Sequence, residues 1–143
     1  MTDISLAAAS RLVDAALEHA RGAGLAPLAV VVLDAGANMV AMKREDGASL
    51  FRGQIAASKA TGALGMGYGT RELARRAQSG PLFYTALMAI TGDIVPSPGG
   101  VLIRDASGRL LGAVGVSGDT GDADEAVALA GISAAGLVGQ PAA

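Results

Sequence analysis

The chain has 143 residues, a length that suits a single domain spanning residues 1–143. The absence of cysteine and the presence of one histidine exclude disulfides, iron–sulfur clusters, a thiol nucleophile and a multi-histidine metal site within one chain. A formal net charge of −2 and an aromatic content of 3% argue against a nucleic acid as the partner.

The composition is apolar for a domain that dissolves in water: 51% hydrophobic and 17% charged residues, with a mean hydropathy of +0.44. The best apolar runs, 28–33 and 82–90, are shorter than the roughly 18 residues that a membrane span needs. The start, MTDISLAAASRL, lacks the basic segment of a secretory signal. We therefore expect a cytoplasmic protein with no membrane partner. Its surplus apolar surface is expected to be buried in a homo-oligomer, a dimer or larger.

The first part of the chain predicts a helix followed by two strands. Thr2 and Asp3 are expected to cap a helix that continues to about Arg21, because apolar residues recur there at helical spacing. The β-branched run 28–34, LAVVVLD, is typical of a buried strand. After the turn AGAN, the run 39–44, MVAMKR, predicts a strand that returns beside it.

The middle of the chain has mostly helical patterns. The small residues from 49 to 66 predict one helix, and residues 70–78 predict a second, with Thr70 as its candidate N-cap. The run 81–90, PLFYTALMAI, fits either a further helix or an apolar strand, and periodicity does not decide between them. Residues 92–100, which include two prolines, are expected to form a loop.

A β-hairpin over residues 101–118 is the clearest structural prediction, because two apolar runs flank the tight-turn sequence DASG. An alanine-rich helix is expected from Thr120 to about Gly136, followed by a frayed tail over 138–143. Because the strands come as hairpins, the sheet is expected to be mainly antiparallel with helices packed on it. The expected fold class is α/β, in the α+β sense.

The second half of that hairpin, GAVGVSGD, has glycines at every third position: Gly112, Gly115 and Gly118. A phosphate-binding P-loop needs a lysine and a hydroxyl after its last glycine, whereas Asp119 follows here. The spacing also differs from the dinucleotide fingerprint, and the strand belongs to a hairpin. These glycines instead indicate that another backbone, another subunit or a flat ligand lies close to the strand.

Several stretches, taken together, resemble the GlcG/HbpS family in sequence, order and spacing, from about Ala7 to Gly131. They read AVVVLDAGANMVAMKREDGAS, IAASKATGAL, PGGVLIRDASGRLLGAVGVSGD and DADEAVALAG. The resemblance implies a profilin-like fold with a central antiparallel sheet, and assembly into dimers or larger oligomers. The family includes heme-binding proteins, a protein of glycolate-utilisation operons and the C-terminal module of some corrinoid adenosyltransferases (the PduO type). Heme or another tetrapyrrole is therefore the ligand class that the resemblance implies.

Heme iron takes histidine, methionine, cysteine or tyrosine as its protein ligand. His19, at the margin of the apolar stripe of the first helix, is the candidate axial ligand, and the alternative is an ordinary surface histidine. Tyr68, Tyr84 and the methionines are weaker candidates. If none of them ligates strongly, hydrophobic contact and pairing of the propionates would hold a heme weakly. Three of the methionines are predicted to fill the core: Met39, Met66 and Met88.

The segment between the second strand and the next helix is a candidate pocket rim. Asp46 would act there as an acceptor or base, and the backbone N–H groups of Gly47 and Ser49 as donors. The structural alternative is a turn and an N-cap. Lys43 and Arg44 come just before this segment, where they can pair with ligand carboxylates or simply remain solvated.

Further candidates come from the later part of the sequence. Arg52 and Lys59 share a helix face, either as a solvated basic stripe or with Lys59 directed into a cleft to meet an anionic substrate or a propionate. Gly99 and Gly100 are candidate backbone donors, or a turn that starts the hairpin. Ser117 can act as a nucleophile only with a base nearby, and the lone histidine lies in a distant helix.

The functional prediction is a cytoplasmic small-ligand-binding protein whose ligand is heme or a related tetrapyrrole. The alternative is a cofactor-independent isomerase, lyase or hydrolase that acts on a small carboxylated or hydroxylated metabolite, with Lys59 and Asp46 as its catalytic residues. A third hypothesis is a purely structural assembly or regulatory module. Asp124 and Glu125 match an acidic pair of the family, and we expect them to favour the start of the last helix electrostatically.

Overall fold

A computed structural model describes residues 3–143 as a five-stranded antiparallel sheet with helices on both faces. The elements are α1 (Leu6–Gly22), β1 (Ala29–Asp34), β2 (Met39–Arg44), α2 (Arg52–Met66), α3 (Thr70–Ser79), α4 (Pro81–Thr91), β3 (Gly100–Arg104), β4 (Leu110–Ser117), α5 (Gly121–Ala134) and β5 (Val138–Gln140). The strand order is β2-β1-β4-β3-β5, with every neighbouring pair antiparallel. The predicted α+β class with an antiparallel sheet is confirmed.

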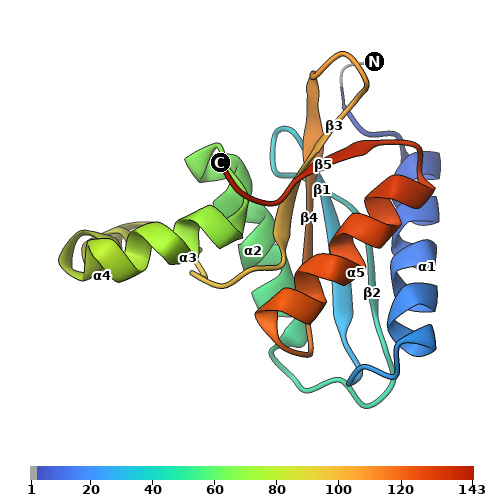
Figure 1. The fold of residues 1–143 in the computed structure, drawn as a ribbon, viewed down its shortest axis with the longest axis horizontal. Coiled ribbons are helices and arrows are strands. Elements are labelled where there is room, and N and C mark those ends of the chain that lie inside the picture. Colours follow the sequence, from blue (N-terminus) through green and yellow to red (C-terminus); the bar gives the residue numbers. More distant parts are fainter. Residues whose placement is uncertain (1–2) are drawn as a thin grey trace.

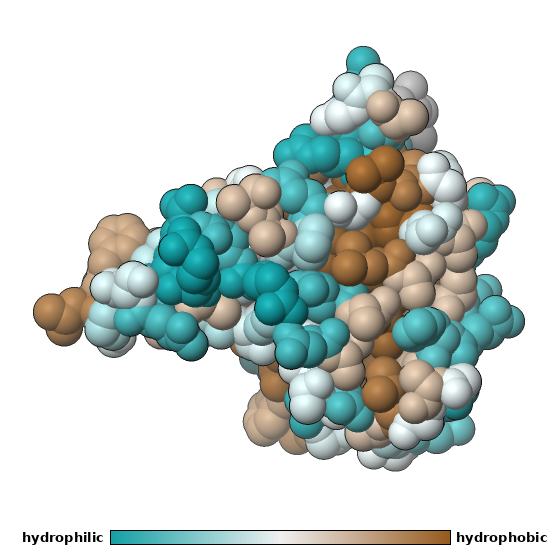
Figure 2. All heavy atoms as spheres, viewed as in Figure 1, coloured by the Kyte–Doolittle hydropathy of each residue, from teal (hydrophilic) through white to brown (hydrophobic). Residues whose placement is uncertain are grey.

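The helices form two layers and an arm. Helices α1 and α5 pack together on one face of the sheet, α2 covers the other face, and α3 and α4 extend away from the body (Figure 1). Figure 2 shows apolar residues beside the upper part of α5 and at the tip of the arm. No helix within residues 3–143 is long and apolar enough to cross a membrane.

Strand β1 contributes side chains to both apolar layers, which explains its unbroken apolar sequence. Val30 and Val32 pack in the layer with α1 and α5, whereas Val31 and Leu33 pack against α2. Successive side chains of a strand point to opposite faces, so a strand covered on both faces is apolar at every position.

The glycines of the hairpin bring the backbone of α2 onto the sheet. A Cβ atom added to Gly115 would collide with the carbonyl oxygen of Ala56, and one added to Gly100 would collide with that of Lys59. Ala60 and Ala63 continue the small-residue face of α2 that packs there. Of the three occupants that the glycine spacing allowed, the structure shows another backbone: that of α2 at Gly115, that of β1 at Gly112, and Pro27–Leu28 at Gly118.

Several predicted helix starts are displaced, because backbone groups near them have tertiary partners. The N-cap of α1 is Ser5, whose hydroxyl accepts from the N–H of Ala8 at 3.1 Å. The preceding residue, Ile4, donates its N–H to the carbonyl of Leu111 at 3.0 Å. Asp3 does not cap the helix but accepts from the N–H of Ala35 at 3.2 Å. The other predicted cap, Thr2, lies outside the described residues.

The other helix boundaries also differ in detail. Helix α2 begins at Arg52, so Ser49 is not its N-cap. Thr70 is the first residue of α3 rather than its cap, and its hydroxyl accepts from the N–H of Gly100 at 2.8 Å. The ambiguous run 81–90 is helical, with Pro81 in the first turn of α4.

Two predictions about packing are wrong. The chain after residue 137 is not a frayed tail: β5 pairs with β3, and the Arg104 guanidinium donates to the Gln140 side chain at 2.8 Å. The N–H of Gly69 also donates to the carbonyl of Ala142 at 3.0 Å. Met39 is exposed on the edge strand β2 and does not fill the core, whereas Met66 and Met88 are half-buried.

We predict that Gly115→Ala lowers the free energy of unfolding by about 1–3 kcal/mol, because the new methyl group has no room against the α2 backbone. Gly65→Ala is the matched control: it lies in α2 with nothing within 4 Å of an added Cβ, and is expected to gain about 0.5–1 kcal/mol. Urea denaturation measures both. Equal stability of the two variants would contradict the close approach of α2.

Candidate functional site

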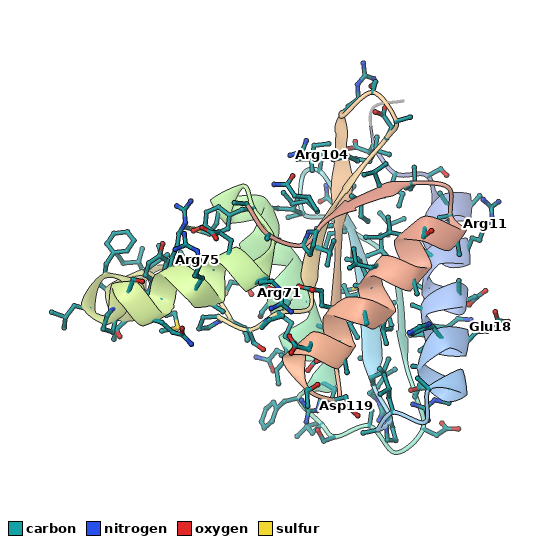
Figure 3. The ribbon with its side chains drawn as sticks, viewed as in Figure 1. Arg11, Glu18, Arg71, Arg75, Arg104 and Asp119 are labelled. Atoms are coloured by element: carbon teal, nitrogen blue, oxygen red, sulfur yellow. The ribbon has the colours of Figure 1, made fainter. Side chains whose placement is uncertain are left out.

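The predicted site residues gather at one end of the sheet, where β2 and β4 end and β3 begins. Lys59 lies there against Gly99 and Gly100, and Ser117 directly follows Val116, whose carbonyl accepts from Lys59. Asp119, labelled in Figure 3, marks this end, just after β4. The predicted rim, residues 44–49, leaves β2 at the same end but stays at the surface.

A buried ion pair forms the centre of this region. The Lys59 ammonium donates to Oδ2 of Asp124 at 3.1 Å and to the carbonyl of Val116 at 3.0 Å. The side chains of Lys59 and Asp124 are only 4% and 2% exposed. Oδ1 of Asp124 accepts from the N–H of Asp119 at 3.0 Å. The lysine thus joins α2 to the start of α5 around the end of β4, and it does not form a solvated stripe with Arg52.

Burial shifts the pKa values of this pair in opposite directions. Loss of water lowers the pKa of Lys59 from its usual 10.5, and the Asp124 carboxylate offsets part of that effect. Burial likewise raises the pKa of Asp124 from its usual 3.8, opposed by the N–H of Asp119 and by Lys59. Each charge therefore depends on the other, and removing one leaves an uncompensated charge in the interior.

The glycines at the start of β3 make room for this pair. Gly99 has a φ of +126°, and a Cβ atom there would lie 2.9 Å from Lys59 Nζ and 3.1 Å from the Asp124 Cβ. The carbonyl of Gly99 accepts from the N–H of Val116 at 3.0 Å. The N–H of Gly100, a predicted ligand donor, is bonded to the Thr70 hydroxyl. These glycines act in the structure as close-packing and turn positions.

Ser117 is buried at the end of β4, and a guanidinium nitrogen of Arg52 donates to its hydroxyl at 3.2 Å. Arginine stays protonated and cannot remove a proton from the serine. Ser117 therefore holds the first turn of α2 to β4, and its contacts include no general base within residues 3–143. The contact between Arg52 and Ser117 is structural, and it does not activate the serine as a nucleophile.

A second region, on the surface, contains the predicted rim. Asp46, Gly47 and Ser49 are exposed, and the Arg44 guanidinium donates to the carbonyl of Ala48 at 2.6 Å. A cavity of about 530 Å³ opens beside this loop, lined by Leu17, Arg21, Pro27, Lys43, Arg44, Glu45 and Asp46. Lys59 is not on that lining, so the structure places Asp46 and Lys59 in separate environments, one open and one closed.

His19 is exposed on α1, two residues from both Leu17 and Arg21, which line the surface cavity. Residues two apart do not share a helix face, so His19 points to the other flank of α1. That flank meets α5, because Gly131 packs against Leu12 and Ala16. The surface cavity lies on the flank that meets β2, where Asp14 pairs with Lys43.

The two tyrosines are poor ligands for an external group. Tyr68 and Tyr84 are buried with their hydroxyl oxygens 3.4 Å apart, and the Arg76 guanidinium lies 4.4 Å from the Tyr68 ring centroid. Burial and the neighbouring hydroxyl raise the pKa of Tyr68 to about 12. Within residues 3–143, no group of three or more His, Asp or Glu side chains could hold a metal ion directly.

Sequence reasoning missed the role of Asp124 as the buried partner of Lys59. The sequence did indicate that Lys59 is buried, because Lys59 shares its helix face with Ala56, Ala60 and Ala63, which are buried. A lysine in such a row needs a carboxylate partner. Asp124 is 65 residues away, and no local pattern identifies it.

Comparison with known proteins identifies the family of this chain. Residues 4–133 match the family model described as "Haem degrading protein HbpS-like". This chain belongs to the HbpS-like family. The sequence resemblance to the GlcG/HbpS family is therefore confirmed.

HbpS-like relatives match over most of their length. A crystal structure of a PduOC–heme complex has a TM-score of 0.86 and 28% identity, covering 95% of this chain and 97% of that one. A crystal structure of HbpS has a TM-score of 0.81 and 33% identity, with 93% and 90% covered. An uncharacterized 15.0 kDa protein from the dhaT–dhaS intergenic region of Citrobacter freundii is 33% identical over 125 residues, 87% of each chain.

We predict that Asp124→Asn costs about 3–5 kcal/mol of unfolding free energy, because Lys59 keeps a buried charge without a carboxylate. Lys59→Met combined with Asp124→Asn is expected to cost less than the sum of the single changes, as a double-mutant cycle in urea would measure. The matched control is the exposed pair Lys43–Asp14, whose coupling should stay within about 1 kcal/mol.

The buried pair also predicts how the stability of the Asp124→Asn variant depends on pH. In Asp124→Asn the pKa of folded Lys59 lies below 10.5, so the unfolded chain binds more protons between the lowered pKa and 10.5. The stability of this variant relative to the native chain therefore recovers as the pH rises through that window. A deficit that is constant from neutral pH to pH 10 would contradict a buried ammonium.

Proposed function

We propose that this HbpS-like protein binds heme or a related tetrapyrrole, with His19 as the axial ligand. The observation that carries the proposal is the likeness, over 95% of this chain, to a protein crystallised as a heme complex. The description of the family model, which names haem degradation, points to the same ligand class. The cytoplasmic location expected from the sequence suits a protein that stores, delivers or degrades such a ligand.

His19 is the one imidazole of this chain, whereas its exposed thioethers, Met39 and Met42, lie on the edge strand β2. The chain has no cysteine, and both tyrosine hydroxyls face each other in the interior of the arm. His19 is exposed, so its imidazole is free to approach an iron without any rearrangement of the core. Bound heme would supply redox or oxygen chemistry at its iron, while the chain would supply the ligand and the surface around the ring.

The proposal places the ring at the surface of α1 on the side that packs against α5. Helices α1 and α5 run in opposite directions (Figure 1), and Gly131 packs against Leu12 and Ala16. His19 follows Ala16 by one turn on the same side of α1, toward the end of α1 from which α5 diverges in Figure 1. The accessible residues of α5 include the small Ala123, Ala126 and Ala130, together with Asp122 and Glu125, which pair with Arg71.

This surface would cover only one side of the ring. A tetrapyrrole held at His19 would need a second apolar surface on its other side to keep water away. The homo-oligomer expected from the surplus apolar composition would provide that cover from a second chain. We therefore expect either one heme per chain or one heme shared by two chains, and not a variable ratio.

The alternative, a cofactor-independent enzyme for a small carboxylated metabolite, is favoured by one observation: the 530 Å³ surface cavity is lined by Arg21, Lys43 and Arg44. In this alternative Asp46 would transfer the proton and Arg44 would pair with the carboxylate. Lys59 would act only by positioning α2, because its ammonium is buried against Asp124. The cavity and His19 lie on opposite flanks of α1, so the two functions can be separated by mutation.

We predict that hemin titration gives a Soret band that saturates at a fixed ratio per chain, and that His19→Ala shifts this band and weakens binding at least tenfold. Absorbance titration and quenching of the two tyrosines measure the effect. Glu18→Ala, which removes a neighbouring side chain that points to solvent in Figure 3, is the matched control and should bind like the native chain.

Binding that never saturates would reject a specific heme site. Saturable binding that His19→Ala leaves unchanged would reject His19 as the ligand. Arg44→Ala distinguishes the heme site from the surface cavity. It should leave the Soret band unchanged if heme lies at the α1–α5 surface.

A further inference from the structure

A second surface cavity, separate from the one beside β2, lies where α3 leaves the body of the protein. It has a volume of about 490 Å³ and is lined mainly by α3, together with Pro98 before β3 and Ala142 after β5. A cavity of this size suits a small metabolite. Its described lining includes no residue of α1, the helix that carries His19.

Backbone hydrogen bonds hold one wall of this cavity in place. The carbonyl of Ala142 accepts from the N–H of Gly69 at 3.0 Å, and the carbonyl of Pro141 accepts from the N–H of Arg71 at 3.3 Å. A Cβ atom added to Gly69 would collide with Pro141, so the chain after β5 packs tightly against the start of α3. These bonds use two N–H groups at the start of α3, and recognition of a ligand therefore falls to the side chains.

Three polar side chains of α3 form a row along the cavity. Arg71, Arg75 and Gln78 follow one another at intervals of four and three residues, which is the spacing of one helix face. The two arginines lie one turn apart, about 6 Å along the helix. Figure 3 shows Arg71 nearer to α5 and Arg75 farther out on α3. The row thus places two guanidiniums and one amide on the same wall.

Carboxylates fix both guanidiniums through the same two nitrogens. Arg71 donates from Nε to Glu125 and from Nη2 to Asp122. Arg75 donates from Nε and from Nη2 to the two oxygens of Glu72. Within residues 3–143, neither Nη1 group has such a partner, so each guanidinium keeps donors for a further acceptor. Side chains that are fixed before a ligand arrives lower the entropic cost of binding it.

The lining of the cavity carries more positive than negative charge. It contains two guanidiniums and, within residues 3–143, one carboxylate, that of Glu72. Glu72 is buried and accepts from both Arg75 and Arg76, and these bonds lower the pKa of Glu72 to about 2. Glu72 therefore stays ionised at neutral pH, and its oxygens serve to hold the arginines in position.

We propose that this cavity binds a small dicarboxylate, with one carboxylate on Arg71 and the other on Arg75. Two acidic groups suit the site because Arg71 is held toward α5 and Arg75 toward Glu72, which keeps the guanidiniums apart. A carboxylate also matches the planar edge of a guanidinium.

The remaining lining residues suit the middle of such a ligand. The Gln78 amide offers a donor and an acceptor, while Ala74 and Pro98 offer apolar contact for a short carbon chain. The inference goes beyond the proposed heme function and does not depend on it.

Isothermal titration calorimetry with succinate tests the proposal. The native chain is expected to bind one succinate, and to bind acetate at least tenfold more weakly because acetate engages a single arginine. Arg75→Gln should raise the dissociation constant for succinate at least tenfold, since a charged hydrogen bond is lost. Gln78→Ala, which leaves the ion pairs intact, should raise it about threefold.

Arg76→Gln is the matched control. Arg76 donates to the same Glu72 at 2.9 Å, but its guanidinium lies over the Tyr68 ring and does not line the cavity. Each substitution leaves Glu72 with one arginine, so a purely structural role predicts equal effects of Arg75→Gln and Arg76→Gln. We expect Arg76→Gln to bind succinate like the native chain, and circular dichroism confirms that each variant folds.

Three results of this titration would overturn the proposal. The first is the absence of saturable succinate binding up to about 10 mM. The second is an equal dissociation constant for succinate in Arg75→Gln and Arg76→Gln, which would leave the arginines a structural role only. The third is binding of inorganic phosphate in preference to succinate, which would assign the site to a tetrahedral anion.

His19→Ala and competition with hemin distinguish this site from the proposed heme site. His19→Ala should bind succinate like the native chain, even where it weakens hemin binding. A native chain that binds succinate but never saturates with hemin would reject the heme proposal alone. Displacement of succinate by hemin would assign Arg71 and Arg75 to the propionates of heme and would reject a separate dicarboxylate site.

Discussion

The close approach of the α2 backbone to strands β3 and β4 is the constraint on which the rest of the structure depends. Gly100 and Gly115 leave no side chain between helix and sheet, so α2 lies on them with its alanine face. At this depth the Lys59 ammonium cannot reach water, and it takes the Asp124 carboxylate and the Val116 carbonyl instead. The ion pair then ties the layer of α2 to the layer of α1 and α5 across the end of the sheet. The close packing of α2 thus buries the Lys59 charge, and the ion pair of Lys59 in turn holds α2 in place against α5.

The two flanks of α1 divide the candidate functions. One flank meets β2 beside the open cavity that contains Arg44 and Asp46. The other meets α5 and includes the exposed His19. A single ligand held by this chain cannot touch both flanks, so the rim predicted from the sequence and the proposed axial ligand belong to different surfaces. Lys59 belongs to neither surface, because the core of the protein uses its charge.

Local patterns predicted the elements well where one residue class dominates. The β-branched run of β1, the tight turn between β3 and β4 and the alanine-rich α5 all formed within a few residues of the predicted ranges. Predictions failed where a distant partner decides the outcome. Strand β5 exists because β3 offers it an open edge, and Ser5 caps α1 because Ile4 is held by Leu111. The site followed the same rule, since nothing near Lys59 in the sequence identifies Asp124.

By itself the sequence determined the fold class, the antiparallel hairpins and the close approach at the glycines, because each of these depends on the period and size of side chains along a short segment. The tertiary structure alone decided which backbone meets the glycines, which carboxylate meets Lys59, which flank of α1 carries His19, and that α4 stays uncovered. Those outcomes depend on how segments tens of residues apart meet in space. A one-dimensional pattern contains the requirement for a partner but not the identity of that partner.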